Sequence, residues 1–225
     1  MTAIKKEVLS FLKKLKKNNN REWFEVNKPD FKRIEAEVKH FGQQLKESLE
    51  ATEHIDGVKL FRVYRDVRFS KDKTPYKTHF GISMHREKPR HRGGYFVQLK
   101  PNENFAAVGF WDPNKEDLLR IRKELELDSS ELRELMDESN FKKTWGKLEG
   151  NELKTSPKGF SKEDPNIDLI RKKMFVFRKR YGDEEVLSPT FLKQLAQDFR
   201  TVRPFLDYMS SVLTTDLNGV SLLEN

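Results

Sequence analysis

Apolar side chains recur at helical spacing through the first fifty residues. In the segment 4–15 the apolar positions lie on one face and lysines on the other, which predicts an amphipathic helix. Asn20 is expected to N-cap a short segment at 21–24, because its side-chain oxygen can accept a hydrogen bond from an unpaired backbone amide. Pro29 is expected to break that segment, and a long helix with an apolar stripe follows across 31–49.

Alternating patterns replace the helical period after Gly57. They predict a short strand at 60–63, a half-buried strand at 80–84, and a hairpin of 95–100 with 105–111. A further strand is expected at 174–181, with Phe175 and Phe177 on one face. Because no strand–helix–strand alternation occurs, the sheet is predicted to be small and mainly antiparallel.

Helical patterns return after residue 111. Asp112-Pro113 is expected to open a helix through 125, and Asp128 with Glu131 has the spacing of a capping box before another. Two more are predicted, one from Asp164-Pro165 through 170 and a last long one from Ser188-Pro189 through 209. The sequence thus predicts a single α+β domain over 1–225, with N-terminal helices in 1–51, strands in 58–111, and C-terminal helices with one further strand in 112–215. Helices from both ends of the chain are expected to pack on the sheet.

Several chemistries are excluded by composition and motif. The chain has no cysteine, so disulfides, thiolate nucleophiles and cysteine-based metal sites are ruled out. It has no Gly-rich phosphate loop, no G-x-S-x-G elbow and no H-E-x-x-H helix. His79, His85 and His91 would share a face of one continuous strand, but Pro89 is expected to end the strand first. The sequence therefore predicts no metal site and no cofactor.

Neither a secretory signal nor a membrane span is apparent. The first ten residues lack a long apolar run, and no segment approaches the roughly 18 apolar residues of a transmembrane helix. We expect a cytoplasmic protein with no membrane partner.

Positive charge is concentrated in one segment. The chain has a net charge of +8, and residues 62–92 alone hold ten basic and three acidic residues, or +7. Such a patch favours an anionic partner more strongly than a diffuse excess does.

The densest part of this segment, 65–79, is the candidate site. Its basic side chains match phosphate or carboxylate, and its aromatic rings could stack on a base. The predicted anion-binding residues are Arg65, Arg68, Lys71, Lys73, Tyr76 and Lys77. The alternative is a solvated loop whose charges pair with Asp66, Asp72 and other acids.

Five stretches of the chain carry a family resemblance. They are Asn19–Phe24, Arg65–Lys77, Gly94-Tyr95 with Leu99, Gly109–Trp111 and Lys158–Phe160. With these motifs in this order, the chain resembles the conserved proteins grouped as domain of unknown function 2461. The resemblance implies no reaction, but it implies that 65–77 is the working surface of the family.

Two of these stretches offer supporting residues. Arg21 and Glu22 are expected beside the basic segment 65–79, although Asn18–Phe24 also fits a helix cap followed by two core aromatics. Lys158 and Gly159 could complete an anion site, because glycine lets the backbone approach a ligand. The same pair fits a tight turn equally well.

Three functions remain open from the sequence. The first is binding of a phosphate-bearing ligand, either nucleic acid or nucleotide. The second is an enzyme acting on a small anionic substrate, with Asp66, Asp72 or His79 as candidate catalytic residues. The third is a protein-interaction domain that meets an acidic partner. The pattern predicts no oligomeric state and does not separate a pocket from an open basic surface.

Overall fold

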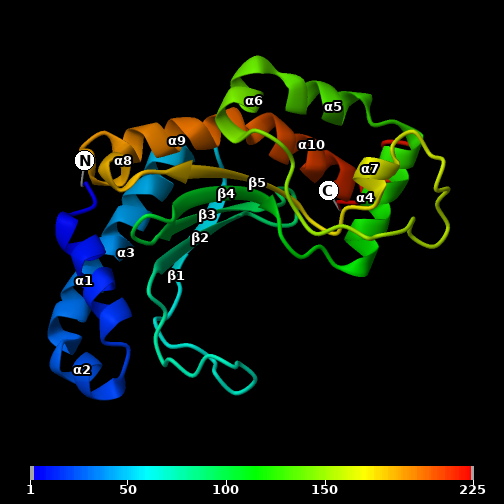
Figure 1. The fold of residues 1–225 in the computed structure, drawn as a ribbon. Helices are drawn as coiled ribbons and strands as arrows, with labels where there is room; N and C mark the ends of the chain where they lie inside the picture. Colours follow the sequence, from blue (N-terminus) through cyan, green and yellow to red (C-terminus); the bar gives the residue numbers. More distant parts are fainter. Residues whose placement is uncertain (1–2, 224–225) are drawn as a thin grey trace. The chain divides into compact units, whose positions relative to one another are not determined.

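The computed structural model describes residues 3–223 and shows an α+β protein (Figure 1). One antiparallel sheet has the order β1-β2-β3-β4-β5, which confirms the predicted fold class. Its strands are β1 (Ile55–Leu60), β2 (Phe80–Arg86), β3 (Gly94–Leu99), β4 (Asn104–Phe110) and β5 (Phe175–Tyr181). The helices are α1 (Lys6–Lys17), α2 (Arg21–Val26), α3 (Lys28–Glu50), α4 (Lys115–Leu127), α5 (Ser130–Asp137), α6 (Ser139–Trp145), α7 (Ile167–Ile170), α8 (Asp183–Leu187), α9 (Phe191–Thr201) and α10 (Arg203–Thr214).

The chain divides into two compact units, each built from three segments. The first unit takes its residues from Met1–Met84, Phe96–Ala106 and Arg180–Gln197. The second takes them from His85–Tyr95, Ala107–Lys179 and Asp198–Asn225. That the whole chain acts as one domain stays a prediction.

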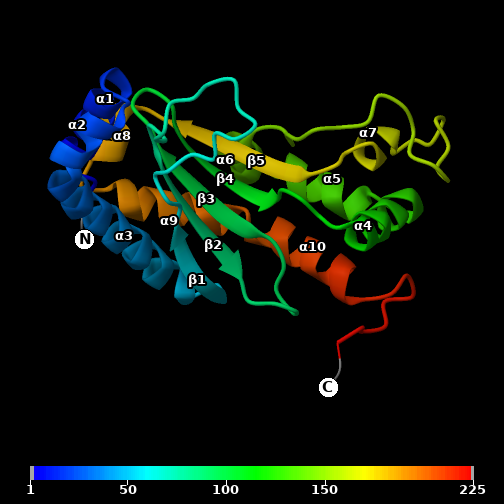
Figure 2. The same ribbon diagram turned by 90° about the horizontal axis from the view of Figure 1, so that it is seen from below.

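Three helices at the start of the first unit lie side by side (Figure 2). The apolar face predicted for α1 is buried, and Asn20 caps α2 by accepting a hydrogen bond from the Trp23 amide at 2.9 Å. Pro29 lies in the first turn of α3, where its missing N–H costs nothing because first-turn amides have no partner within the helix. Pro29 thus lies at the start of α3, and α2 ends before it, at Val26.

The sheet of the first unit has one face covered by α3. Gly42 of α3 lies so close to the strands that a Cβ there would be 3.0 Å from Val58 and 3.1 Å from Ile82. Ile82 points towards α3, and its neighbour Gly81 is on the opposite face of the sheet, because successive strand residues alternate between faces. The rings of Phe61 and Phe96 lie over Gly81 on that second face.

Aromatic rings join the elements of the second unit. Phe177 of β5 packs edge-on against Phe141 of α6 and Phe205 of α10, with ring centroids 4.8 and 5.0 Å away. Phe175 and Phe177 are both fully buried, so the face predicted for this strand is confirmed. Arg86 is also buried and contacts Asp207 and Ser210 of α10.

One predicted strand is in the wrong place. The pattern indicated 60–63, whereas β1 spans Ile55–Leu60. The Phe61 amide still donates to the Gly81 carbonyl at 2.9 Å, but beyond it Val63 pairs with Lys77. Strand limits follow from cross-strand partners, which local alternation does not reveal.

The helix boundaries also needed correction. Helix α4 is capped by Asn114 and not by Asp112, α5 has no side-chain cap, and α7 is only the stretch Ile167–Ile170. The last predicted helix is divided into α9 and α10 at Val202. Pro204 explains the break, because a proline cannot donate to the preceding turn and its ring clashes with the carbonyl four residues earlier.

Helices α6 and α8 were missed because each is shorter than the window in which helical periodicity is visible. Over residues 3–223, none of the helices combines the length and the apolar character that crossing a membrane requires.

Candidate functional site

The basic segment forms a long loop between β1 and β2 (Figure 1). Its ends are joined by an antiparallel bridge between Tyr64 and Tyr76. The Arg65 amide donates to the Pro75 carbonyl at 2.9 Å, and the Lys77 amide donates to the Val63 carbonyl at 2.7 Å. The bridge therefore closes residues 65–75, which we call the basic loop.

Asn19 fastens this bridge to the end of α1. Its side-chain amide donates to the Tyr76 carbonyl at 2.9 Å, and its side-chain oxygen accepts from the Tyr76 amide at 3.1 Å. The Tyr76 ring is buried and stacks on Phe24 with centroids 4.0 Å apart. The motifs Asn19–Phe24 and Arg65–Lys77 thus pack on each other.

Tyr76 was predicted to face a ligand, but its ring is 3% exposed and belongs to the core. Phe24 is buried, as the helix-cap interpretation expected, whereas Trp23 is half-buried with its ring centroid 5.7 Å from that of Phe11. These rings hold the base of the loop in place.

Arg65 points inward and organises the basic loop. Its guanidinium contacts Asp72 and the hydroxyl of Thr74, and it donates to the Thr74 carbonyl at 3.2 Å. Hydrogen bonds from the backbone and side chain of Thr74, and then from Arg65, lower the pKa of Asp72 to about 2. Asp72 is therefore ionised at neutral pH, and it accepts hydrogen bonds from Arg65 and Thr74.

Two more of the predicted binding cations are used within the loop. Arg68 is exposed and pairs with Asp66 at 2.7 Å, which lowers the pKa of that carboxyl group. Lys73 donates to the Val67 carbonyl at 2.9 Å. Lys71 is exposed. The side chains of Arg65, Arg68 and Lys73 therefore do not converge on a common point.

A hollow of about 360 Å³ opens at the base of the loop, and we call it the basal hollow. It lies between the end of α1 and the chain that leads into β2. Its lining residues are Lys16, Asn19, Arg65, Asp72, Thr74, Tyr76, Lys77, Thr78 and His79. The sequence pointed to the loop and to His79, but it did not indicate Lys16, and Asn19 was noted only as the start of a family motif.

The basal hollow is electropositive. Burial, and then the charge of Arg62, lowers the pKa of the Lys77 ammonium. Burial, and then the charges of Lys77 and Lys100, lowers the pKa of His79. No carboxylate in the described part of the chain forms an ion pair with Lys16 or Lys77. The charged forms of Lys77 and His79 are disfavoured until a negative charge arrives.

A second hollow of about 480 Å³ continues from the first. It shares Lys16 and Thr78 with the basal hollow and adds the lysines at 13, 17 and 100. Lys13 pairs with Asp183 at 3.5 Å, and Lys100 pairs with Glu103 at 2.6 Å. The two hollows together form a basic groove along α1.

The other predicted residues have different settings. Arg21 and Glu22 are exposed in the first turn of α2 and do not line the basal hollow. Lys158 and Gly159 belong to the second unit. There Gly159 has φ +86° and the Phe160 amide donates to the Pro157 carbonyl at 3.1 Å, which is the tight turn considered as the alternative.

Within residues 3–223 no group of three or more His, Asp or Glu side chains is arranged to hold a metal ion. Strand β2 ends at Arg86, five residues before His91. The three histidines therefore do not share one strand face.

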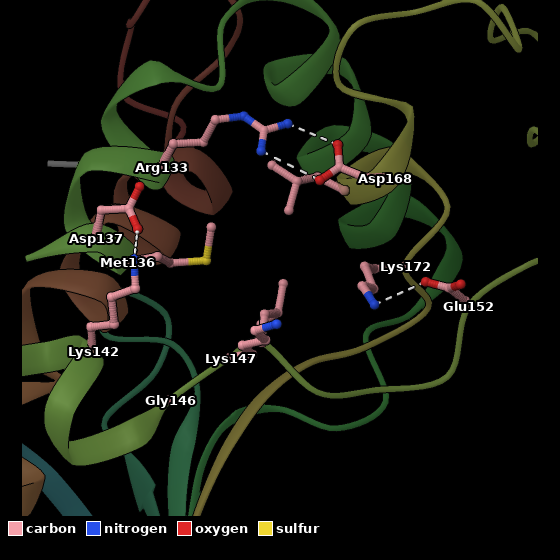
Figure 3. A pocket seen from close by; sticks show the side chains of 11 residues that line it. Arg133, Met136, Asp137, Lys142, Gly146, Lys147, Glu152, Asp168 and Lys172 are labelled. Carbon is pink, nitrogen blue, oxygen red and sulfur yellow. Dashed lines mark hydrogen bonds and ion pairs between the residues drawn. The ribbon is translucent and has the colours of Figure 1, made fainter.

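The second unit has a hollow of its own, of about 370 Å³, which the sequence did not indicate (Figure 3). Three ion pairs surround it: Arg133–Asp168 at 2.8 Å, Lys142–Asp137 at 2.7 Å and Lys172–Glu152 at 2.9 Å. Each acid that lines it is already neutralised by a neighbour. Because its residues come from four separate stretches, no local pattern could have revealed it.

Comparison with known proteins identifies the family. The pattern of the family described as conserved hypothetical protein (DUF2461) matches residues 7–208. The chain therefore belongs to the family of domain of unknown function 2461, which confirms the resemblance drawn from the motifs. No curated protein and no solved structure was found to match the chain.

Proposed function

We propose that this member of the domain of unknown function 2461 family binds a phosphate-bearing ligand, a nucleotide or a nucleic acid, in the basal hollow. The observation that carries the proposal is the meeting of Lys16, Lys77 and His79 around one opening. The two lysines lie 61 positions apart in the chain. No described carboxylate forms an ion pair with either ammonium.

Electrostatics support an anion at this place. Burial and then neighbouring positive charges lower the pKa values of Lys77 and His79, and a bound phosphate would favour the charged form of each. Asn19, Thr74 and Thr78 add hydrogen-bonding groups around the opening. Asp72 also lines the hollow, but its charge is matched by Arg65. The site therefore suits a dianion better than a neutral ligand.

Binding is favoured over catalysis by the state of the two loop carboxylates. Asp66 and Asp72 both accept hydrogen bonds from arginine, and the pKa of each is lowered. A general acid or base works best with a pKa near the operating pH. Neither carboxylate meets that condition, so we assign both to loop structure.

The proposal is tested by titrating the protein with inorganic tripolyphosphate and with an oligodeoxynucleotide at several salt concentrations. We expect binding at low salt that weakens steeply as salt rises, because counterions are released from the polyanion. Lys77→Gln and Lys16→Gln should each weaken binding and reduce the slope of log affinity against log salt by about one. Calorimetry and fluorescence anisotropy provide the affinities.

Lys115→Gln is the matched control, since Lys115 is an exposed lysine at the start of α4 in the second unit. It should leave both the affinity and the salt slope unchanged. Equal affinities for all three variants and the unaltered protein would rule out the basal hollow. Binding of an acidic protein without binding of either polyanion would favour an interaction domain instead.

The protonation of His79 gives a separate prediction. Its ordinary pKa is 6.5 and burial lowers it, so the side chain is neutral at pH 7 in the free protein. An anion in the basal hollow favours the imidazolium, so tripolyphosphate should raise the pKa of His79 and bind more tightly as pH falls. Without anion, the free energy of unfolding changes in the opposite direction. Neutral, buried His79 contributes to stability above pH 6.5, and this contribution is lost as pH falls below 6.5.

This prediction is measured by NMR, following the ring Cε1–H signal of His79 against pH with and without tripolyphosphate. The signal of His40, which is exposed on α3, is the control and should not respond to the anion. A His79 titration that is identical in both conditions would place the anion elsewhere.

A further inference from the structure

Three aromatic rings stand exposed within a single short segment. Phe61 is 37% exposed, Tyr64 46% and Phe69 96%. Among the Phe, Tyr and Trp side chains of residues 3–223, these three are the exposed ones. Scattered exposed apolar residues are ordinary on protein surfaces, but a group of rings in one basic segment indicates an interaction surface.

The ring of Phe69 does not stabilise the loop that carries it. Burial of apolar area is what makes a ring stabilising, and this ring is almost fully in solvent. The loop is held instead by polar contacts, chiefly those of Arg65 with Asp72 and Thr74. A phenylalanine at this position is therefore free to serve a ligand.

Two of the three exposed rings are accompanied by cations. The ammonium groups of Lys59 and Lys77 lie 5.5 and 5.6 Å from the ring centroid of Phe61. The guanidinium carbon of Arg68 lies 6.0 Å from the centroid of Phe69. Rings alternating with positive charges match a strand of bases alternating with phosphates.

Lys77 connects Phe61 to the basal hollow. Its side chain lines the hollow and also approaches Phe61. A phosphate held beside Lys77 would thus place the attached nucleoside near the Phe61 ring. The flexible ammonium groups that now lie beside this ring can turn to the phosphates when a base takes their place.

On the second face of the sheet, two further rings continue from Phe61. Phe61 leads to Phe96 and then to Phe105, with ring centroids 6.1 and 5.7 Å apart. Gly81 permits this arrangement, because a Cβ there would lie 3.1 Å from the Phe96 ring and 3.3 Å from the Phe61 ring. The half-buried rings of Phe96 and Phe105 therefore continue from the exposed ring of Phe61.

We propose that the ligand is a single-stranded nucleic acid, with a phosphate in the basal hollow and bases stacked on Phe61, Tyr64 and Phe69. This inference rests on the proposed function and narrows it. A duplex keeps its base faces stacked inside, so only unpaired bases can use exposed rings. A mononucleotide would use one ring and leave the others without a role.

The test compares a ligand that has bases with one that has none. Dissociation constants are measured for oligodeoxythymidylate, a matched DNA duplex and inorganic tripolyphosphate. The variants are Phe61→Ala, Phe69→Ala and Phe69→Trp, beside the charge variant Lys77→Gln. Leu119→Ala is the control, since Leu119 is an apolar side chain that is 51% exposed in the second unit.

We expect Phe61→Ala and Phe69→Ala each to raise the dissociation constant for oligodeoxythymidylate about tenfold, as loss of one stacked base does. Their affinity for tripolyphosphate and their salt slope should be unchanged, because no charge is removed. Phe69→Trp should keep or strengthen oligonucleotide binding. Leu119→Ala should change neither ligand.

The test separates failure of base stacking from failure of anion binding in the basal hollow. If Lys77→Gln weakens binding but both alanine variants bind oligodeoxythymidylate normally, stacking is refuted and the basal hollow stands. Duplex binding as tight as single-strand binding would also overturn the inference. If the unaltered protein binds neither tripolyphosphate nor oligonucleotide, the proposed function fails together with it.

Discussion

Replacing Gly109 with alanine is expected to lower the free energy of unfolding by about 4 kcal/mol or more, at the upper end of single-substitution effects. Gly109 has φ +131°, and a Cβ there would lie 2.0 Å from the carbonyl oxygen of Phe175. The obstacle is backbone and cannot rotate away. Strands β4 and β5 would have to separate at this point. Urea unfolding followed by circular dichroism measures the loss.

Gly159→Ala provides the matched control for Gly109→Ala. Gly159 also has a positive φ, of +86°, but no atom lies within 4 Å of the position that its Cβ would take. Only the backbone conformation is penalised there, at about 1–2 kcal/mol. Equal losses for the two variants would show that the close approach of β4 to β5 is not what demands glycine at 109.

Replacing Asn19 with alanine is expected to loosen the basic loop and to cost about 2–4 kcal/mol. The side chain satisfies both backbone groups of Tyr76, and an unsatisfied buried group costs roughly 1–3 kcal/mol. Faster hydrogen exchange at the Tyr76 amide and faster proteolysis within 65–75 would report the change. Anion binding should weaken as well, because Lys77 and Thr78 follow Tyr76 directly in the chain.

Asn18→Ala is the control for Asn19→Ala. The Asn18 side chain donates to the Lys14 carbonyl within the end of its own helix and does not touch the loop. The substitution should cost about 1 kcal/mol or less and leave exchange at Tyr76 unchanged. If both asparagine variants behaved alike, Asn19 would not be what anchors the loop.

Local patterns predicted most of the elements. The apolar face of α1, the cap at Asn20, the hairpin of β3 with β4 and the strand β5 all depend on residues close together in the chain. The errors lie where distant partners decide. Strand β1 starts at Ile55 because of its pairing with β2, whereas local alternation had indicated a strand at 60–63.

The sequence indicated a segment for the candidate site, but not which of its side chains remain available to a ligand. The charge pattern indicated 65–79 and the family motif 65–77, and seven residues of this segment line the basal hollow beside Lys16 and Asn19. Arg65, Arg68 and Lys73 were expected to bind a ligand, yet they hold acids and carbonyls of the loop. Which donors a folded loop consumes depends on its closed shape, so composition alone does not show which remain available.

The amino-acid sequence by itself determined the α+β class, the family and the segment that carries the excess charge, because these depend on composition, short-range periodicity and motif order. Only the tertiary structure decided that Asn19 secures Tyr76 from 57 positions away. It alone brought Lys16 of α1 to the base of the loop and left Phe69 in solvent while burying Tyr76. The physical reason is that contacts between distant segments determine which polar groups are satisfied and which rings are covered. No single stretch of the chain contains both partners of such a contact.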